Sequence, residues 1–142
     1  FEMQISREIA QHRAFELNII RTLAIMFMVS GVLKFSGHPM LSEAFVRWGY
    51  PVWFSYCVGV IELSAGLMLL SPRTLFYGGV LLSLQMFGAF FTHIVHGEAV
   101  IAVLPLGLMV LMAQIVHHNS TPIVAKMDRL LKWYELDGKR PQ

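Results

Sequence analysis

The stretch PVWFSYCVGVIELSAGLMLL, residues 51–70, decides the fold, because it holds twenty residues with a single charge, Glu62. An α-helix rises 1.5 Å per residue, so about 20 residues cross the roughly 30 Å hydrocarbon core of a bilayer. The proline at position 51 suits the first turn of a helix. The stretch therefore predicts a membrane-spanning helix that carries one carboxyl group in its interior.

Three further apolar stretches of similar length lie on either side of the first. The four expected spans cover residues 17–35, 51–70, 75–95 and 99–116. A soluble bundle would need polar outer faces on these helices, and the stretches lack them. The connections are short, so neighbouring helices should run antiparallel. We therefore expect an all-α membrane protein with an antiparallel up-down four-transmembrane-helix bundle over residues 15–118.

The composition agrees with a membrane protein and excludes several other classes. Of the 142 residues, 56% are hydrophobic and 14% are charged, whereas a soluble domain carries about 25% charged residues. The net charge of +2 is too small to suggest nucleic-acid binding, and the lipid bilayer is the expected partner. The single cysteine, Cys57, excludes an intramolecular disulfide and a multi-cysteine zinc or iron–sulfur site.

Basic residues gather on one side of the predicted bundle. With four spans, both termini and the turn at residues 71–74 share that side, and only Lys34 and Arg47 lie on the other. The positive-inside rule therefore places both termini in the cytoplasm. The eight basic residues on the cytoplasmic side are Arg7, Arg13, Arg73, Lys126, Arg129, Lys132, Lys139 and Arg140.

Two segments flank the bundle. Residues 1–14 are interpreted as a cytoplasmic N-terminal extension, and residues 119–142 as a cytoplasmic amphipathic tail. In the tail, Thr121 and Pro122 favour a helix start. Apolar residues follow at helical spacing, with basic residues outside their stripe. We expect a C-terminal amphipathic helix that lies on the cytoplasmic leaflet, or one that docks onto a soluble partner.

Polar residues inside the spans are costly, so they mark the candidate site. Glu62 is the strongest candidate, because Ser55, Gly59 and Gly66 fall on the same helical stripe. Small residues on a membrane helix mark close contact with a neighbouring helix. Glu62 should therefore face the bundle interior, where it needs either a proton or a nearby cation.

Arg21 is the cation expected beside Glu62, because both lie toward the cytoplasmic end of their spans. A buried arginine–carboxylate pair would form two parallel hydrogen bonds. Two alternatives stay open: the pair only fixes helix register, or Arg21 extends to the lipid headgroups. Gln85 lies at mid-depth and is expected to hydrogen-bond near Glu62 or to a neighbouring backbone. The predicted polar intramembrane site is therefore Arg21, Glu62 and Gln85.

A second group of polar residues is expected at the outer ends of the spans. This predicted outer-face polar cluster comprises Lys34, His38, His93 and His96. Histidine titrates near neutral pH and binds metals, so the cluster suits proton handling or metal binding, although histidines that simply contact lipid headgroups at the interface are commoner. We expect no metal site. Haem is not expected either, because a bis-histidine site would need a second histidine at matching depth on another span, and His117 and His118 lie at the opposite membrane face. No G-x-S-x-G, HExxH or P-loop motif is present, so catalytic residues stay unknown.

Three sequence motifs point to a known family. The first span reads RTLAIMFMVSGVLKF, with Arg21, Gly31 and Lys34; the second contains ELSAG from Glu62; the third ends GAFFTHIVHGE, with His93. Together these motifs resemble the DoxX-like family of small four-span membrane proteins, over about residues 15–116. The resemblance implies the four-span fold and a bacterial cytoplasmic membrane.

The resemblance also implies what the protein does. Family members resemble the small subunit of thiosulfate:quinone oxidoreductase, and others accompany oxidative-stress enzymes. We therefore expect an integral membrane subunit that is accessory to a quinone-linked redox complex, with a quinone as ligand and protein partners that carry the redox cofactor. Two alternatives are a non-catalytic structural or assembly subunit of a larger membrane complex and a small proton-coupled transporter.

Overall fold

The computed structural model describes the backbone of residues 2–137 and the side chains of residues 3–4, 7–8 and 11–120. Within these residues the chain is all-helical, as predicted. The helices are α1 (Glu2–Phe35), α2 (Pro39–Arg47), α3 (Val52–Leu69), α4 (Leu75–Val95) and α5 (Ala99–Asp137).

Four helices are long and apolar enough to cross a membrane. The spanning parts are Gln11–Phe35, Val52–Leu69, Leu75–Val95 and Ala99–Ser120. Their outer faces carry large exposed apolar side chains, for example Val29, Phe91 and Val103, which are 54%, 61% and 66% exposed. Exposed apolar surface of this extent is typical of contact with lipid. The prediction of an integral membrane protein with four spanning helices is confirmed.

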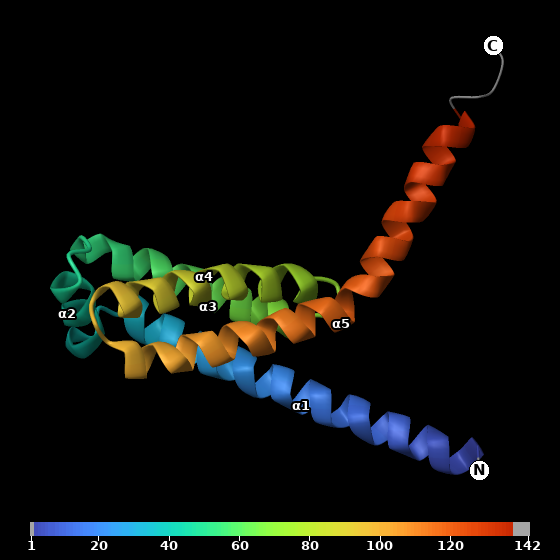
Figure 1. The fold of residues 1–142 in the computed structure, drawn as a ribbon, viewed down its shortest axis with the longest axis horizontal. Coiled ribbons are helices and arrows are strands. Elements are labelled where there is room, and N and C mark those ends of the chain that lie inside the picture. Colours follow the sequence, from blue (N-terminus) through green and yellow to red (C-terminus); the bar gives the residue numbers. More distant parts are fainter. Residues whose placement is uncertain (1, 138–142) are drawn as a thin grey trace.

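Each spanning helix packs on the next spanning helix in the chain. Helix α1 packs on α3, α3 packs on α4, and α4 packs on α5. Helix α2 and the α4–α5 connection lie at one end of the bundle, and the α3–α4 turn lies at the other (Figure 1). The N-terminal part of α1 and the second half of α5 extend beyond the bundle at the end opposite α2 (Figure 1).

The backbones of α1 and α3 touch where glycines face each other. A Cβ added at Gly31 would lie 2.6 Å from the Gly59 carbonyl oxygen, and one added at Gly66 would lie 3.0 Å from that of Ala24. Positions rising along α1 therefore meet positions falling along α3, so these two helices run in opposite directions. Small residues permit such close approach in membranes. The stripe predicted to face the interior, Ser55, Gly59, Glu62 and Gly66, is buried.

Helix α2 was not predicted, because residues 36–50 were expected to be only a connection. It begins at Pro39, directly after His38, and proline is common at the first position of a helix. Leu41, Phe45 and Trp48 recur at helical spacing and face the bundle. Nine residues are too short to span a bilayer, so this amphipathic segment lacks the long apolar stretch that predicts a spanning helix.

The tail differs from its prediction as a separate helix that starts at Thr121. Helix α5 continues without interruption to Asp137, so Pro122 lies inside it. Proline lacks the backbone N–H that would bond one turn back, and it kinks helices. Helix α5 changes direction where it leaves the bundle, to the right of its label in Figure 1. The side chains of residues 121–142 lie outside the described part, so the amphipathic stripe stays a prediction.

Candidate functional site

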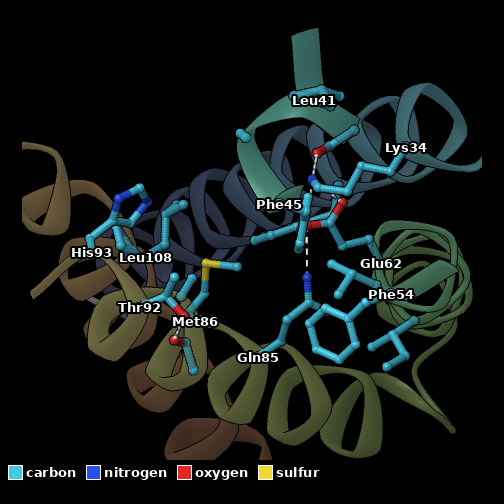
Figure 2. Close-up of a pocket in the computed structure, with 18 of the residues that line it drawn as sticks. Lys34, Leu41, Phe45, Phe54, Glu62, Gln85, Met86, Thr92, His93 and Leu108 are labelled. Atoms are coloured by element: carbon cyan, nitrogen blue, oxygen red, sulfur yellow. Dashed lines mark hydrogen bonds and ion pairs between the residues drawn. The ribbon is translucent and has the colours of Figure 1, made fainter. Parts of the chain in front are cut away.

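The half of the bundle nearer α2 contains a cavity of about 730 Å³, and all five helices contribute to its lining. Most of the wall is apolar, with Leu41, Phe45, Phe54, Met86 and Leu108 among the lining residues (Figure 2). The polar side chains of the wall are Ser30, Lys34, Trp48, Tyr50, Glu62, Gln85, Thr92 and His93.

Lys34 and Glu62 form an ion pair across the α1–α3 contact. Lys34 Nζ lies 2.8 Å from Glu62 Oε2 and 3.0 Å from Oε1, and it also donates to Ser30 Oγ at 2.6 Å. An ammonium has three hydrogens, and these three acceptors use all of them. Glu62 is only 3% exposed, so the prediction that it faces the interior is confirmed.

Gln85 joins the ion pair from α4. Its Nε2 donates to Glu62 Oε1 at 2.7 Å (Figure 2). A carboxylate only accepts, so the amide nitrogen must face it. The amide oxygen of Gln85 is then buried without a hydrogen-bond partner among the described residues. The network of Ser30, Lys34, Glu62 and Gln85, here called the polar network, connects α1, α3 and α4.

The cation beside Glu62 is therefore Lys34 and not Arg21, which is exposed. Arg21 precedes Lys34 by thirteen residues, which places it about 20 Å away along α1 and about 140° around the helix. The prediction matched Arg21 to Glu62 by depth in the membrane alone. Both depth and helix face differ from that prediction: Gly31 meets Gly59 and Ala24 meets Gly66, so Arg21 lies beyond the level of Glu62 as well as on another face of α1.

His93 lines the cavity at its α2 end and pairs with Glu98. Its Nδ1 lies 2.7 Å from Glu98 Oε2, and Arg47 Nη2 lies 3.9 Å from Glu98 Oε1. The hydrogen bond with His93 holds the pKa of the Glu98 carboxyl below its usual value, and the charges of His93 and Arg47 act in the same direction. The Trp48 ring packs edge-on against His93 at 5.0 Å. These contacts connect α2 to the α4–α5 connection.

The predicted outer-face polar cluster divides in two. Lys34 and His93 line the cavity, whereas His38 and His96 are exposed and do not. His38 sits at the start of α2, and His96 Nδ1 lies 2.8 Å from the Thr92 carbonyl oxygen. The prediction grouped residues by membrane depth, and the structure places His38 and His96 just outside the helices, before α2 and after α4, with exposed side chains.

Several cavity residues were missed from the sequence. The Tyr50 and Thr92 hydroxyls lie 2.8 Å apart, and Thr92 also donates to the Gly88 carbonyl oxygen at 2.9 Å. Thr92 has one hydrogen, so Tyr50 is the donor in their shared bond. Ser30, Trp48 and Tyr50 were not among the predicted site residues. Ser30 lies four residues before Lys34, one turn away on the same face, which was an available signal.

Comparison with known proteins places the chain in a family. The model of the DoxX-like family matches residues 20–115. A search of curated proteins and one of solved structures each found no significant match. The matched range covers more than half of the chain and includes the whole polar network. The chain belongs to the DoxX-like family.

Proposed function

We propose that this DoxX-like protein is the membrane subunit of a quinone-linked redox complex and that its cavity binds the quinone. The observation that carries the proposal is an apolar cavity of about 730 Å³ with one polar network on its wall. Small-molecule sites typically measure about 300–1,000 Å³ and combine apolar walls with a few placed polar groups. A quinone has the matching chemistry, since its ring carries two carbonyl oxygens and its tail is a hydrocarbon.

Ser30 is the residue best suited to bind a quinone carbonyl. Its oxygen accepts from Lys34, and its own O–H has no acceptor among the described residues. The neighbouring ammonium polarises this hydroxyl and strengthens it as a donor. A quinone oxygen held by Ser30 would lie beside the positive end of the ion pair, which favours the negative charge that builds up during reduction.

Protons and electrons would reach the quinone by separate routes. Reduction to the quinol takes up two electrons and two protons. Glu62 and His93 are the cavity groups suited to proton transfer, and His93 connects the cavity to Glu98 at the α2 end. The electrons would come from a partner subunit that carries a redox cofactor, and the basic side of the protein is the docking surface we propose for it.

The proposed location is a bacterial cytoplasmic membrane with both termini in the cytoplasm. Support comes from the basic residues: the two expected on the α2 side both have a carboxylate partner, since Lys34 pairs with Glu62 and Arg47 lies 3.9 Å from Glu98. The positive-inside rule then favours the opposite side as cytoplasmic. A C-terminal green fluorescent protein fusion should fluoresce, and a C-terminal alkaline phosphatase fusion should be inactive. The reverse pattern would overturn this orientation.

One observation favours a second candidate, a structural or assembly subunit. The polar network connects three helices and satisfies both charges of the ion pair. Buried ion pairs of this kind serve in some proteins only to specify packing. In that case the protein would hold its partners together without binding a quinone.

The test is quinone binding by purified protein in lipid nanodiscs, quantified by extraction and chromatography. We expect about one long-tailed quinone per chain, a loss of at least tenfold in affinity in Ser30→Ala, and no change in Arg21→Gln, whose side chain is exposed. Equal thermal unfolding midpoints would show that both variants fold. Wild-type protein that binds no quinone but keeps its partners would support the structural candidate instead.

A further inference from the structure

We infer that the ligand enters sideways from the bilayer between α1 and α5, and that its hydrocarbon tail stays in this opening while its ring sits at the polar network. The inference rests on the proposed function and specifies the ligand as a long-tailed quinone. It also assigns Met26 and Leu104, which no step of the proposed function uses, to the rim of the opening, here called the lateral portal.

The packing of the helices leaves the cavity wall open between α1 and α5. Three of the four seams around the cavity are packed: α1 with α3, α3 with α4, and α4 with α5. Helices α1 and α5 do not pack along one another, although both line the cavity. An ion pair between Glu16 and His118, at 3.3 Å, connects them toward the end opposite α2. The gap therefore lies between this ion pair and α2.

The α2 end of the cavity is closed by side chains. Phe45 of α2 and Trp48, which directly follows α2, line the cavity, and the Trp48 ring packs on His93. Arg47 and Glu98 hold α2 to the α4–α5 connection, with 3.9 Å between their nearest charged atoms. A bulky quinone would have to displace these rings to enter from water, so the bilayer is the easier route.

The rim of the lateral portal is apolar and lies at the depth of the acyl chains. Met26 is 43% exposed and Leu104 is 68% exposed, and both also line the cavity. At 1.5 Å per residue, Met26 lies about 14 Å from the end of α1 at Phe35, and Leu104 lies about 8 Å from the start of α5 at Ala99. A rim of this kind admits hydrocarbon and disfavours polar solutes.

Side chains on one face of α1 line the path from the lateral portal to the ion pair. Met26, Ser30 and Lys34 are spaced four residues apart on α1, and all three line the cavity. Residues at this spacing share a helix face, and the eight residues span about 12 Å. A quinone ring bound at Ser30 and Lys34 would therefore place its tail at Met26, with the rest of the tail outside the protein among the lipids.

The experiment compares a quinone with a long isoprenoid tail and the same ring without a tail, both titrated against the protein in nanodiscs. Leu104→Trp should fill the lateral portal, weaken binding of the long-tailed quinone at least tenfold, and leave the tail-less ring within twofold. Val103→Trp is the matched control, because Val103 is 66% exposed on the neighbouring position and does not line the cavity. Met26→Trp tests the opposite rim should Leu104→Trp unfold.

The possible outcomes separate the two proposals. If the long-tailed and tail-less quinones respond equally to Leu104→Trp and Met26→Trp, or do not respond, the lateral portal is wrong and quinone binding stands. If neither quinone binds to the wild type, the proposed function fails and the portal with it. If Val103→Trp matches Leu104→Trp, the effect comes from bulk on α5 and the lateral portal is also overturned.

Discussion

The Lys34 ammonium contacts both oxygens of the Glu62 carboxylate, at 2.8 and 3.0 Å, inside a membrane-spanning bundle. The pair is possible because the Gly31 and Gly59 backbones touch one turn away and bring α1 against α3. Taking either charge out of water costs several kcal/mol, and the pairing offsets that cost only while both partners are present. The stability of the bundle should therefore depend on the pair as a unit.

Removing one member of the pair should destabilise the protein more than removing both. We expect Glu62→Gln, which leaves Lys34 charged and unpaired, to lower the free energy of unfolding by roughly 3–5 kcal/mol. Lys34→Met should have an effect of similar size, because it leaves Glu62 unpaired. The double variant should recover part of the loss. Chemical unfolding in detergent micelles measures all three.

The control for the double-mutant comparison is Arg21→Gln, which removes an exposed charge from the same helix. A surface change of this kind typically alters stability by less than about 0.5 kcal/mol. Additive losses in the double variant would show that Lys34 and Glu62 are not energetically coupled. A large loss of stability in Arg21→Gln would show that Arg21 has a structural role.

The glycine contact between α1 and α3 predicts a sharp difference between two glycines. A Cβ at Gly31 would lie 2.6 Å from the Gly59 oxygen and 2.7 Å from the Leu63 nitrogen, so the backbones must separate. Overpacking of this kind costs about 1–3 kcal/mol, and Gly31→Ala should lower the thermal unfolding midpoint. The separation should also weaken the nearby Lys34–Glu62 pair.

Gly107 provides the matched control, because nothing lies within 4 Å of a Cβ added there. Alanine is a better helix former than glycine by about 0.5–1 kcal/mol, so Gly107→Ala should leave stability unchanged or raise it. An equal loss at Gly31 and Gly107 would mean that the α1–α3 contact is looser than the backbone distances indicate.

The all-helical fold and the four spanning helices were predictable, because they depend on length, polarity and helical spacing. The interior position of Glu62 followed from the small residues on its own stripe. The partner of Glu62 did not follow, because the choice between Arg21 and Lys34 depends on which positions of α1 and α3 meet and on how α1 is rotated about its axis. That rotation is set by the contact of Gly31 with Gly59 across two helices, and no single stretch of sequence contains it. The cavity-lining residues Phe45 and Trp48 were missed for a similar reason, because they reach the cavity only when α2 folds over the end of the bundle.

The contact between His93 and Glu98 should make stability depend on pH in acid. The pKa of Glu98 is lowered in the folded protein, chiefly by its hydrogen bond with His93. A group with a lowered pKa stabilises the fold above its unfolded pKa, about 4.3 for glutamate, and loses this effect as the pH falls through the folded pKa. The difference in unfolding midpoint between wild type and Glu98→Gln should therefore shrink as the pH falls below about 5.

Glu43→Gln is the control for this pH series, because Glu43 is an exposed glutamate on α2. Its difference from wild type should stay small across the whole range. A gap between wild type and Glu98→Gln that widens in acid would contradict the lowered pKa of Glu98.

The hydroxyl of Tyr50 should contribute more to the free energy of unfolding than the hydroxyl of an exposed tyrosine. Tyr50 donates to Thr92 at 2.8 Å and so connects the α2–α3 connection to α4 at the cavity wall. Tyr50→Phe keeps the ring, including its stack on Phe54 at 4.8 Å, and removes only the donor. A hydrogen bond of this kind contributes about 1 kcal/mol, and we expect a loss of that size in chemical unfolding. Tyr77→Phe is the matched control, since Tyr77 is 55% exposed and should lose little. If Thr92→Val adds its full cost on top of Tyr50→Phe, the two hydroxyls act independently and the bond between them does not stabilise the fold.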